Sequence, residues 1–164
     1  MITKWNFQTP TEEELHKRDK LATELGLSPV VCLLLVQRGL TTVEEVKKFF
    51  KPSLSDLHDP FLMPDMENAV KRLNKALGNK EKILVYGDYD VDGTTAVSLV
   101  YKFLRPYSSS LDYYIPDRYD EGYGISYKGI NYAKENGITL IISLDCGIKA
   151  IEKIEYAKEL GIDF

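Results

Sequence analysis

Hydrophobic and polar positions follow two different patterns along the chain. In the first part, apolar residues recur at helical spacing in three short segments, residues 11–27, 28–40 and 41–52. Each segment opens on or just before a threonine or serine that can cap a helix, and each closes near glycine or proline. A stretch rich in Pro, Ser and Asp follows at residues 52–66 and indicates an ordered linker. We therefore expect a small helical lead and linker over residues 1–65.

The pattern changes at residue 66, where short apolar runs begin to alternate with amphipathic segments. The helical segments are residues 66–77, 94–104, 126–137 and 148–161. The strand-like runs are residues 82–86, 111–115, 138–144 and 162–164, the last being the first residues of a fourth strand. Such alternation is typical of βαβ units. It predicts the α/β class, with a doubly wound, mostly parallel sheet over residues 66–164 and a small helical segment before it.

Composition limits the range of functions. The chain has 164 residues, 44% hydrophobic and 28% charged, as soluble globular proteins have. Its net charge of −4 argues against a protein that coats nucleic acid, but not against an enzyme that grips phosphates through bound cations. It contains no membrane-length apolar run and no apolar signal core, and Cys32 and Cys146 lack disulfide or metal spacing. We expect a cytoplasmic protein without a membrane partner.

Acidic residues cluster where two of the predicted strands end. Asp88, Asp90 and Asp92 occupy alternate positions after the run at 82–86, and Asp145 follows the run at 138–144. The carboxyl ends of neighbouring parallel strands share one edge of a sheet, so both loops should face the same side. Carboxylates this close together disfavour each other's ionisation, and divalent cations offset that repulsion. The pattern predicts a metal site.

The residues alone leave four interpretations of this cluster open. One is a solvated turn. A second is a calcium-binding EF-hand, which residues 88–93 match, although Leu99 stands where a glutamate is required and a strand precedes the loop. A third is a haloacid-dehalogenase-like phosphatase, whose D-x-D-G-T pattern fits residues 90–94. In that class the first Asp follows the strand directly and a flap precedes the helix, which this spacing does not match. The fourth is a metal-dependent phosphoesterase.

Three motifs favour the fourth interpretation. The stretch YGDYDVDGTTA, residues 86–96, resembles motif I of the DHH phosphoesterase superfamily. The stretches YIPDRYDEGYGIS, residues 114–126, and SLDCGI, residues 143–148, are similar to the single-strand-specific exonucleases of that superfamily. The resemblance covers nearly all of the chain from Ser28 onward, with the motifs in the same order.

The resemblance implies roles for the acidic residues. Asp90, Asp92 and Asp145 would be metal ligands and catalytic carboxylates. Asp88 would be either a further ligand or a residue that supports the ligands without contacting the metal. Many superfamily members carry a histidine where this sequence has Tyr86, so one metal subsite would depend more on Asp88. The implied cofactors are two Mn²⁺ or Mg²⁺ ions in the full-length enzyme, which hydrolyse a phosphodiester by two-metal catalysis.

Substrate contacts are expected from two places. Gly93, Thr94 and Thr95 open a helix whose N–H groups suit a phosphate, although the threonines would serve equally as helix caps. In the loop after the second strand, an arginine could hold a phosphate and a tyrosine could stack on a base, or the arginine could pair with neighbouring acids and the tyrosines could pack. The resemblance favours substrate contact here. The candidate residues of this loop are Arg118, Glu121, Gly122, Tyr123 and Gly124.

The function implied is that of a metal-dependent exonuclease that degrades single-stranded DNA from its 5′ end in recombination and DNA repair. Single-stranded DNA is the implied substrate, and single-strand binding protein a candidate partner. The alternatives are a DHH-type phosphodiesterase for oligonucleotides or cyclic dinucleotides, and the haloacid-dehalogenase-like phosphatase. The superfamily's Asp-His-His motif is not among the 164 residues. We therefore expect an N-terminal fragment that is inactive alone, and the oligomeric state stays open.

Overall fold

The structure, a computed structural model, describes residue 4 and residues 9–164. The chain divides into two compact units, Met1–Asp59 and Pro60–Phe164. A domain boundary between residues 65 and 66 stays a prediction. Among the described residues, no helix combines the length and the apolar character needed to cross a membrane.

The described part of the first unit contains three α-helices: α1 (Glu12–Leu25), α2 (Pro29–Gln37) and α3 (Val43–Phe50). Both α1 and α3 begin at a capping box, in which a threonine accepts from the N–H three residues ahead and a glutamate reaches back to the threonine N–H. A 3₁₀ turn, η1 (Leu54–Asp56), follows α3. The buried core consists of Leu21, Cys32, Leu35, Val36 and Val46. The predicted N-terminal helices are confirmed.

The second unit contains a parallel three-stranded sheet. After a 3₁₀ turn, η2 (Pro60–Leu62), and helix α4 (Met66–Gly78) come the strands β1 (Ile83–Gly87), β2 (Leu111–Tyr114) and β3 (Leu140–Leu144). Their order is β2-β1-β3, and both pairings are parallel. An isolated parallel bridge joins Leu140 to Asp163 on the free side of β3. The parallel sheet is thus confirmed, and the fourth strand is seen as this one bridge.

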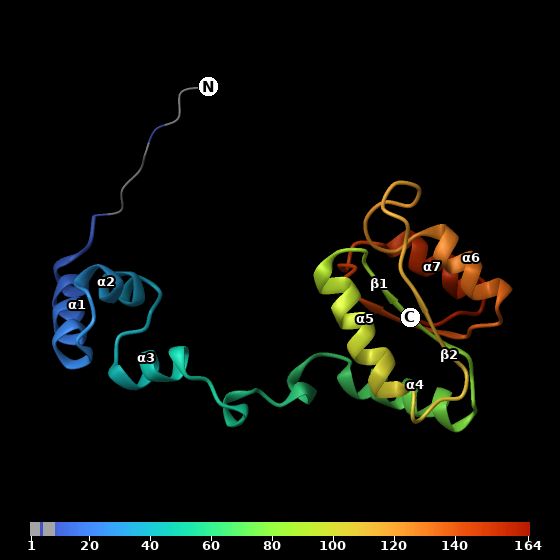
Figure 1. Ribbon diagram of the computed structural model, residues 1–164, viewed down its shortest axis with the longest axis horizontal. Coiled ribbons are helices and arrows are strands. Elements are labelled where there is room, and N and C mark those ends of the chain that lie inside the picture. The colour runs from blue at the N-terminus through green and yellow to red at the C-terminus, as the bar shows by residue number, and fades with distance from the viewer. Residues whose placement is uncertain (1–3, 5–8) are drawn as a thin grey trace. The chain divides into compact units, whose positions relative to one another are not determined.

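Helices cover both faces of the sheet. Figure 1 shows α4 and α5 (Val91–Leu104) on one side of the strands and α6 (Tyr127–Glu135) and α7 (Ile151–Glu159) on the other. Val85 packs with Val97 and Leu104 of α5, whereas Leu84 and Tyr86 pack with residues of α6 and α7. The alternation of facing residues along β1 follows from the pleat of a strand. The doubly wound α/β fold is confirmed.

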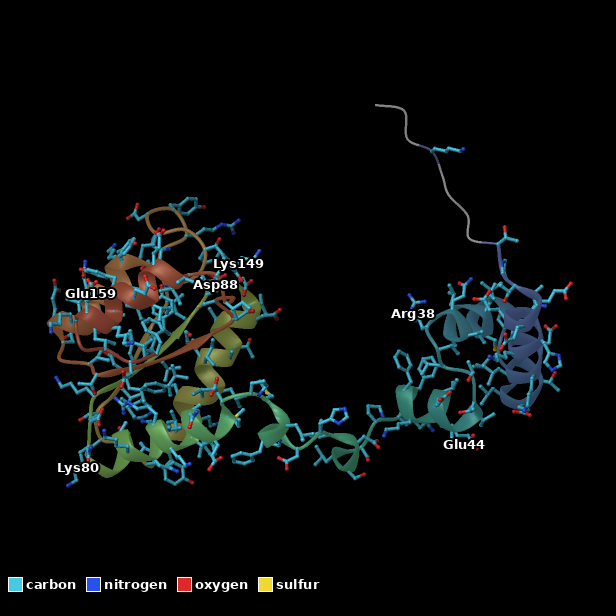
Figure 2. All side chains as sticks on the ribbon, turned by 180° about the vertical axis from the view of Figure 1, so that it is seen from behind. Arg38, Glu44, Lys80, Asp88, Lys149 and Glu159 are labelled. Atoms are coloured by element: carbon cyan, nitrogen blue, oxygen red, sulfur yellow. The ribbon has the colours of Figure 1, made fainter. Side chains whose placement is uncertain are left out.

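This topology fixes where a ligand would bind. The chain passes from β1 to β2 through α5 on one face, and from β2 to β3 through α6 on the other face. The direction of winding therefore reverses at β1, and ligands of such sheets bind at the carboxyl ends of the strands beside that reversal. Asp88 lies at this end of β1 with Lys149, away from Lys80, which precedes the strand (Figure 2).

Two helices begin at positions that differ from the sequence prediction. Helix α5 begins at Val91, earlier than the predicted residue 94, because Asp90 rather than a threonine caps it. Helix α7 begins at Ile151, later than the predicted residue 148, because Gly147 adopts a left-handed conformation (φ 65°) and keeps the preceding segment irregular.

Candidate metal centre

The chain passes almost directly from β1 into α5, and this turn carries three of the four aspartates. Asp90 is the N-cap of α5, and its carboxylate accepts a hydrogen bond of 2.9 Å from the Gly93 N–H. Asp92 lies in the first turn of α5 and is exposed. A Cβ on Gly93 would lie 2.7 Å from both the backbone N and the carbonyl carbon of Asp88. The missing side chain of Gly93 therefore allows the helix to start against the strand end.

Asp88 is fully buried at the end of β1. Its Oδ1 accepts a hydrogen bond of 3.1 Å from the Gly124 N–H. Its Oδ2 is buried and has no hydrogen-bond partner. A buried carboxylate oxygen without a partner is unfavourable by several kcal/mol, so such an atom usually has a positive ligand. Asp88 Oδ2 fits a cation.

Asp145 directly follows β3 and lies near the three aspartates that follow β1. Its backbone is left-handed (φ 56°), a conformation that Asp tolerates better than most residues, and its side chain is exposed. Desolvation raises the pKa of Asp145 first, and the charges of Asp90, Asp92 and Asp88 and a hydrogen bond with Asp90 raise it further. The carboxylates from both strand ends are therefore within electrostatic reach of each other.

The four carboxylates match a hard divalent cation in the kind of donor atom that they offer. Within the part of the chain that the structure describes, no three Asp, Glu, His or Cys side chains are already positioned around one point as a metal site. One cause is the helix cap, which holds the Asp90 carboxylate against Gly93. Full coordination would require rotation of side chains such as Asp145, or ligands beyond these residues.

Glu121 organises the loop between β2 and α6. Its side chain is only 4% exposed. It accepts hydrogen bonds from the Tyr114 hydroxyl (2.9 Å), the Asp117 N–H (2.9 Å) and the Ser126 hydroxyl. Burial raises the pKa of Glu121, but these hydrogen bonds outweigh burial and the net pKa is lowered. The carboxylate therefore points into its own loop and holds the loop's shape.

An arginine and two tyrosines lie beside the carboxylates. The Arg118 guanidinium lies 5.4 Å from the ring centroid of Tyr89, in a cation–π contact. The Tyr89 ring meets the Tyr123 ring edge to face, with 6.5 Å between centroids. The Tyr123 hydroxyl donates a hydrogen bond of 3.1 Å to the Asp145 carbonyl. Arg118 thus stacks on a tyrosine, and it forms no ion pair with an acid among the described residues.

Gly93 and Thr94, in the first turn of α5, form hydrogen bonds with the N-cap residue Asp90. The Gly93 N–H binds the Asp90 carboxylate, and the Thr94 N–H binds the Asp90 carbonyl at 3.0 Å. The Thr94 hydroxyl also donates to that carbonyl, at 2.7 Å. Thr95 is exposed. The Thr94 hydroxyl thus bonds back to the first turn of its own helix, while Asp90 caps that helix. Substrate contact by Thr94 and Thr95 stays a prediction.

The sequence missed two features of the site. Tyr89, between two aspartates, was not singled out; the signal was an aromatic residue inside the acidic motif. Of the two glycines expected to contact substrate, Gly122 and Gly124, only Gly124, with φ 78°, contacts one of the carboxylates, that of Asp88. The direct entry into α5 leaves no flap of the phosphatase type, and a strand instead of a helix precedes the loop, unlike an EF-hand.

Carboxylates gather at the carboxyl edge of a parallel sheet, with an arginine and tyrosines beside them, so the fold and the site define an α/β protein with an acidic candidate site. Residues 82–164 match the DHH family, N-terminal domain. The chain belongs to the DHH family.

Relatives of known name agree with this assignment. The chain is 40% identical over 160 residues to the single-stranded-DNA-specific exonuclease RecJ of Bacillus subtilis (strain 168), covering 98% of this chain and 20% of that protein. It is 32% identical over 137 residues to the RecJ of Escherichia coli (strain K12), covering 83% of this chain and 23% of that protein. The chain therefore spans about a fifth of the length of the curated relatives it matches.

Solved structures are similar as well. An exonuclease RecJ bound to manganese aligns with a TM-score of 0.55 and 30% identity, covering 62% of this chain and 26% of that chain. RecJ in complex with Mn²⁺ from Thermus thermophilus aligns with a TM-score of 0.64 and 23% identity, covering 90% of this chain and 20% of that chain. The second likeness shows the fold alone.

Proposed function

We propose that this chain is the N-terminal part of a metal-dependent exonuclease that hydrolyses single-stranded DNA from its 5′ end, in recombination and DNA repair. The observation that carries the proposal is the buried Asp88 carboxylate, whose Oδ2 has no partner, beside Asp90, Asp92 and the Asp145 carboxylate of a neighbouring strand. The names of the relatives, single-stranded-DNA-specific exonuclease, supply the substrate class. Repair and recombination, in which single strands arise, are the processes we propose for this activity.

The aspartates would hold Mn²⁺ or Mg²⁺, the former being the ion bound in the similar RecJ structures. When bound, a pair of such ions supplies an activated water and neutralises charge on the phosphodiester. Asp90, Asp92 and Asp145 would hold the ions, since they come from two neighbouring strand ends, and Asp88 would be a further, buried ligand. Asp88 and Asp145 directly follow β1 and β3, and Asp90 and Asp92 stand at the start of α5, so regular elements position these side chains.

Substrate contacts would come from the side chains of Arg118 and Tyr123, which lie beside the aspartates. Arg118 is exposed and carries a planar cation that matches a phosphate in two-point geometry. Tyr123 is 59% exposed, so part of its ring is open to a base. Glu121, by contrast, would act by holding the loop, because its carboxylate is buried within it. Gly122 and Gly124 would give the loop its two left-handed turns.

The setting of the protein is part of the proposal. We place it in the cytoplasm, where its free and buried cysteines, Cys32 and Cys146, stay reduced. Single-strand binding protein would be its partner on DNA. The 164-residue chain by itself would show no appreciable nuclease activity, since it spans only about a fifth of the length of its curated relatives.

A chimera tests the function. The matching N-terminal segment of the Bacillus subtilis relative would be replaced by this chain, and degradation of a 5′-labelled single strand would be followed with Mn²⁺ present. We expect degradation from the 5′ end that Asp90→Asn abolishes, and that Asp120→Asn, a charge-matched change at an exposed site, leaves within a few fold. Retained activity in the Asp90→Asn chimera would refute the proposal. Cleavage of cyclic dinucleotides but not of long strands would favour the alternative phosphodiesterase.

A further inference from the structure

The hydroxyl of Tyr86 makes an unusual pair of contacts at the end of β1. Tyr86 is the largest fully buried side chain among the described residues. Its hydroxyl donates a hydrogen bond of 2.9 Å to the Gly124 carbonyl and accepts one of 3.0 Å from the Ser126 N–H. Burial raises the pKa of Tyr86 to about 12, so the phenol stays protonated and remains a donor. The strand thereby holds two backbone groups of the loop before α6.

Gly124 links this hydroxyl to the acidic cluster. Its carbonyl accepts from Tyr86, while its N–H donates to Asp88 Oδ1 at 3.1 Å. Its φ of 78° is a conformation that side chains rarely adopt, and a Cβ there would lie 3.3 Å from the Cys146 carbonyl. Tyr86 lies in β1 and Asp88 directly follows that strand, so only Gly87 separates the two residues. Two consecutive hydrogen bonds thus connect Tyr86 to Gly124 and Gly124 to the Asp88 carboxylate.

We infer that Tyr86 is a positioning residue for the metal centre: through Gly124, its hydroxyl fixes the Asp88 carboxylate so that Oδ2 faces the neighbouring aspartates. This inference rests on the proposed function, because it assumes that Asp88 binds a metal ion. Outer groups that orient a metal ligand commonly change metal affinity about 10- to 100-fold when they are removed. The same contact ties the loop that carries Arg118 and Tyr123 to the metal side of the site.

Tyr86→Phe removes the hydroxyl and keeps the ring. The ring stacks on Tyr114, with 5.4 Å between centroids and 16° between planes, and phenylalanine retains this stacking. The Gly124 carbonyl and the Ser126 N–H are left buried without their partner, which favours displacement of the loop. Tyr114→Phe is the matched control. It deletes a hydroxyl from the stacked neighbour, but that hydroxyl binds Glu121 and does not contact Gly124.

Two measurements on the 164-residue chain test the inference: amide hydrogen exchange of Gly124 without metal, and Mn²⁺ affinity by electron paramagnetic resonance titration. Tyr86→Phe should speed Gly124 exchange and weaken Mn²⁺ binding, each about 10-fold or more. Tyr114→Phe should leave both within about twofold of wild type. In the wild type, the Gly124 amide should be protected before any metal is added, which can be checked even if a variant does not fold.

The outcomes separate the inference from the function on which it rests. Equal loss of Mn²⁺ affinity in both variants would show a merely structural role and overturn the inference, as would an unprotected Gly124 amide in the wild type. Wild-type affinity in Tyr86→Phe would overturn it too, while leaving the proposed function intact. Absence of Mn²⁺ binding by the wild type would overturn the inference, whereas the proposed function is tested separately by the activity of the Asp90→Asn chimera.

Discussion

Gly93→Ala should destabilise the α/β unit, although it replaces a helical glycine with the best helix former. Gly93 lies in the first turn of α5, where Ala normally stabilises a helix by about 1 kcal/mol over Gly. Here the added Cβ would lie 2.7 Å from the backbone N and carbonyl carbon of Asp88, and closer still to its carbonyl oxygen. These are backbone atoms of a buried strand end, so they cannot rotate away as a side chain could.

The magnitude follows from the two opposing effects. Overpacking costs about 1–3 kcal/mol in well-packed interiors, and a clash with backbone belongs at the upper end of that range. Subtracting the helix gain of about 1 kcal/mol leaves a net destabilisation of about 2 kcal/mol. For a chain of this length, that corresponds to a fall of about 4–8 °C in unfolding temperature.

Calorimetry of both variants provides the assay and its control. Gly78→Ala makes the same chemical change at the last residue of α4, where an added Cβ would meet nothing within 4 Å. That variant should match the wild type or exceed it by up to about 1 kcal/mol. A Gly93→Ala protein that unfolds at or above the wild-type temperature would refute the close approach of α5 to Asp88.

Two further predictions concern single carboxylates. Because desolvation and, after it, neighbouring charges raise the Asp145 pKa, its ionised form is disfavoured in the fold, and stability falls as pH rises through the raised value. Asp145→Asn should therefore unfold at a higher temperature in EDTA yet gain less from Mn²⁺ than wild type does; lower stability in EDTA would contradict this. Glu121 has a lowered pKa, so its contribution is present above about pH 4.3 and is lost as pH falls through the lowered value. Glu121→Gln should be less stable than wild type at neutral pH, and thermal unfolding near about pH 3 should show a smaller difference; an equal difference at both pH values would count against the buried-carboxylate account.

Local signals in the sequence were sufficient for most of the fold. The caps at Thr11 and Thr42 depend on residues within one turn, so they can be identified from the sequence directly. Alternation of strands and helices implied a parallel sheet, and the rule that parallel strands end at one edge brought Asp145 to the aspartates of β1. Chain topology alone therefore identified the candidate site.

The hydrogen bonds that shape the site could not be predicted from the sequence. The roles of Tyr86 and Gly124 depend on the path of the loop before α6, which brings residues 36–40 positions apart into hydrogen-bonding distance. The burial of Glu121 arises in the same way, from Tyr114 on one side and Ser126 on the other. Sequence spacing carries no signal for a loop path of this kind.

The convergence of carboxylates from β1 and β3 on one cation is the central claim, and anomalous X-ray scattering from crystals of the chain grown with Mn²⁺ tests it most directly. We predict a manganese peak within about 2.0–2.6 Å of Asp88 Oδ2, or of Asp90, and of the Asp145 carboxylate. A peak bound elsewhere, with Asp145 turned away from Asp88 and Asp90, would contradict the account.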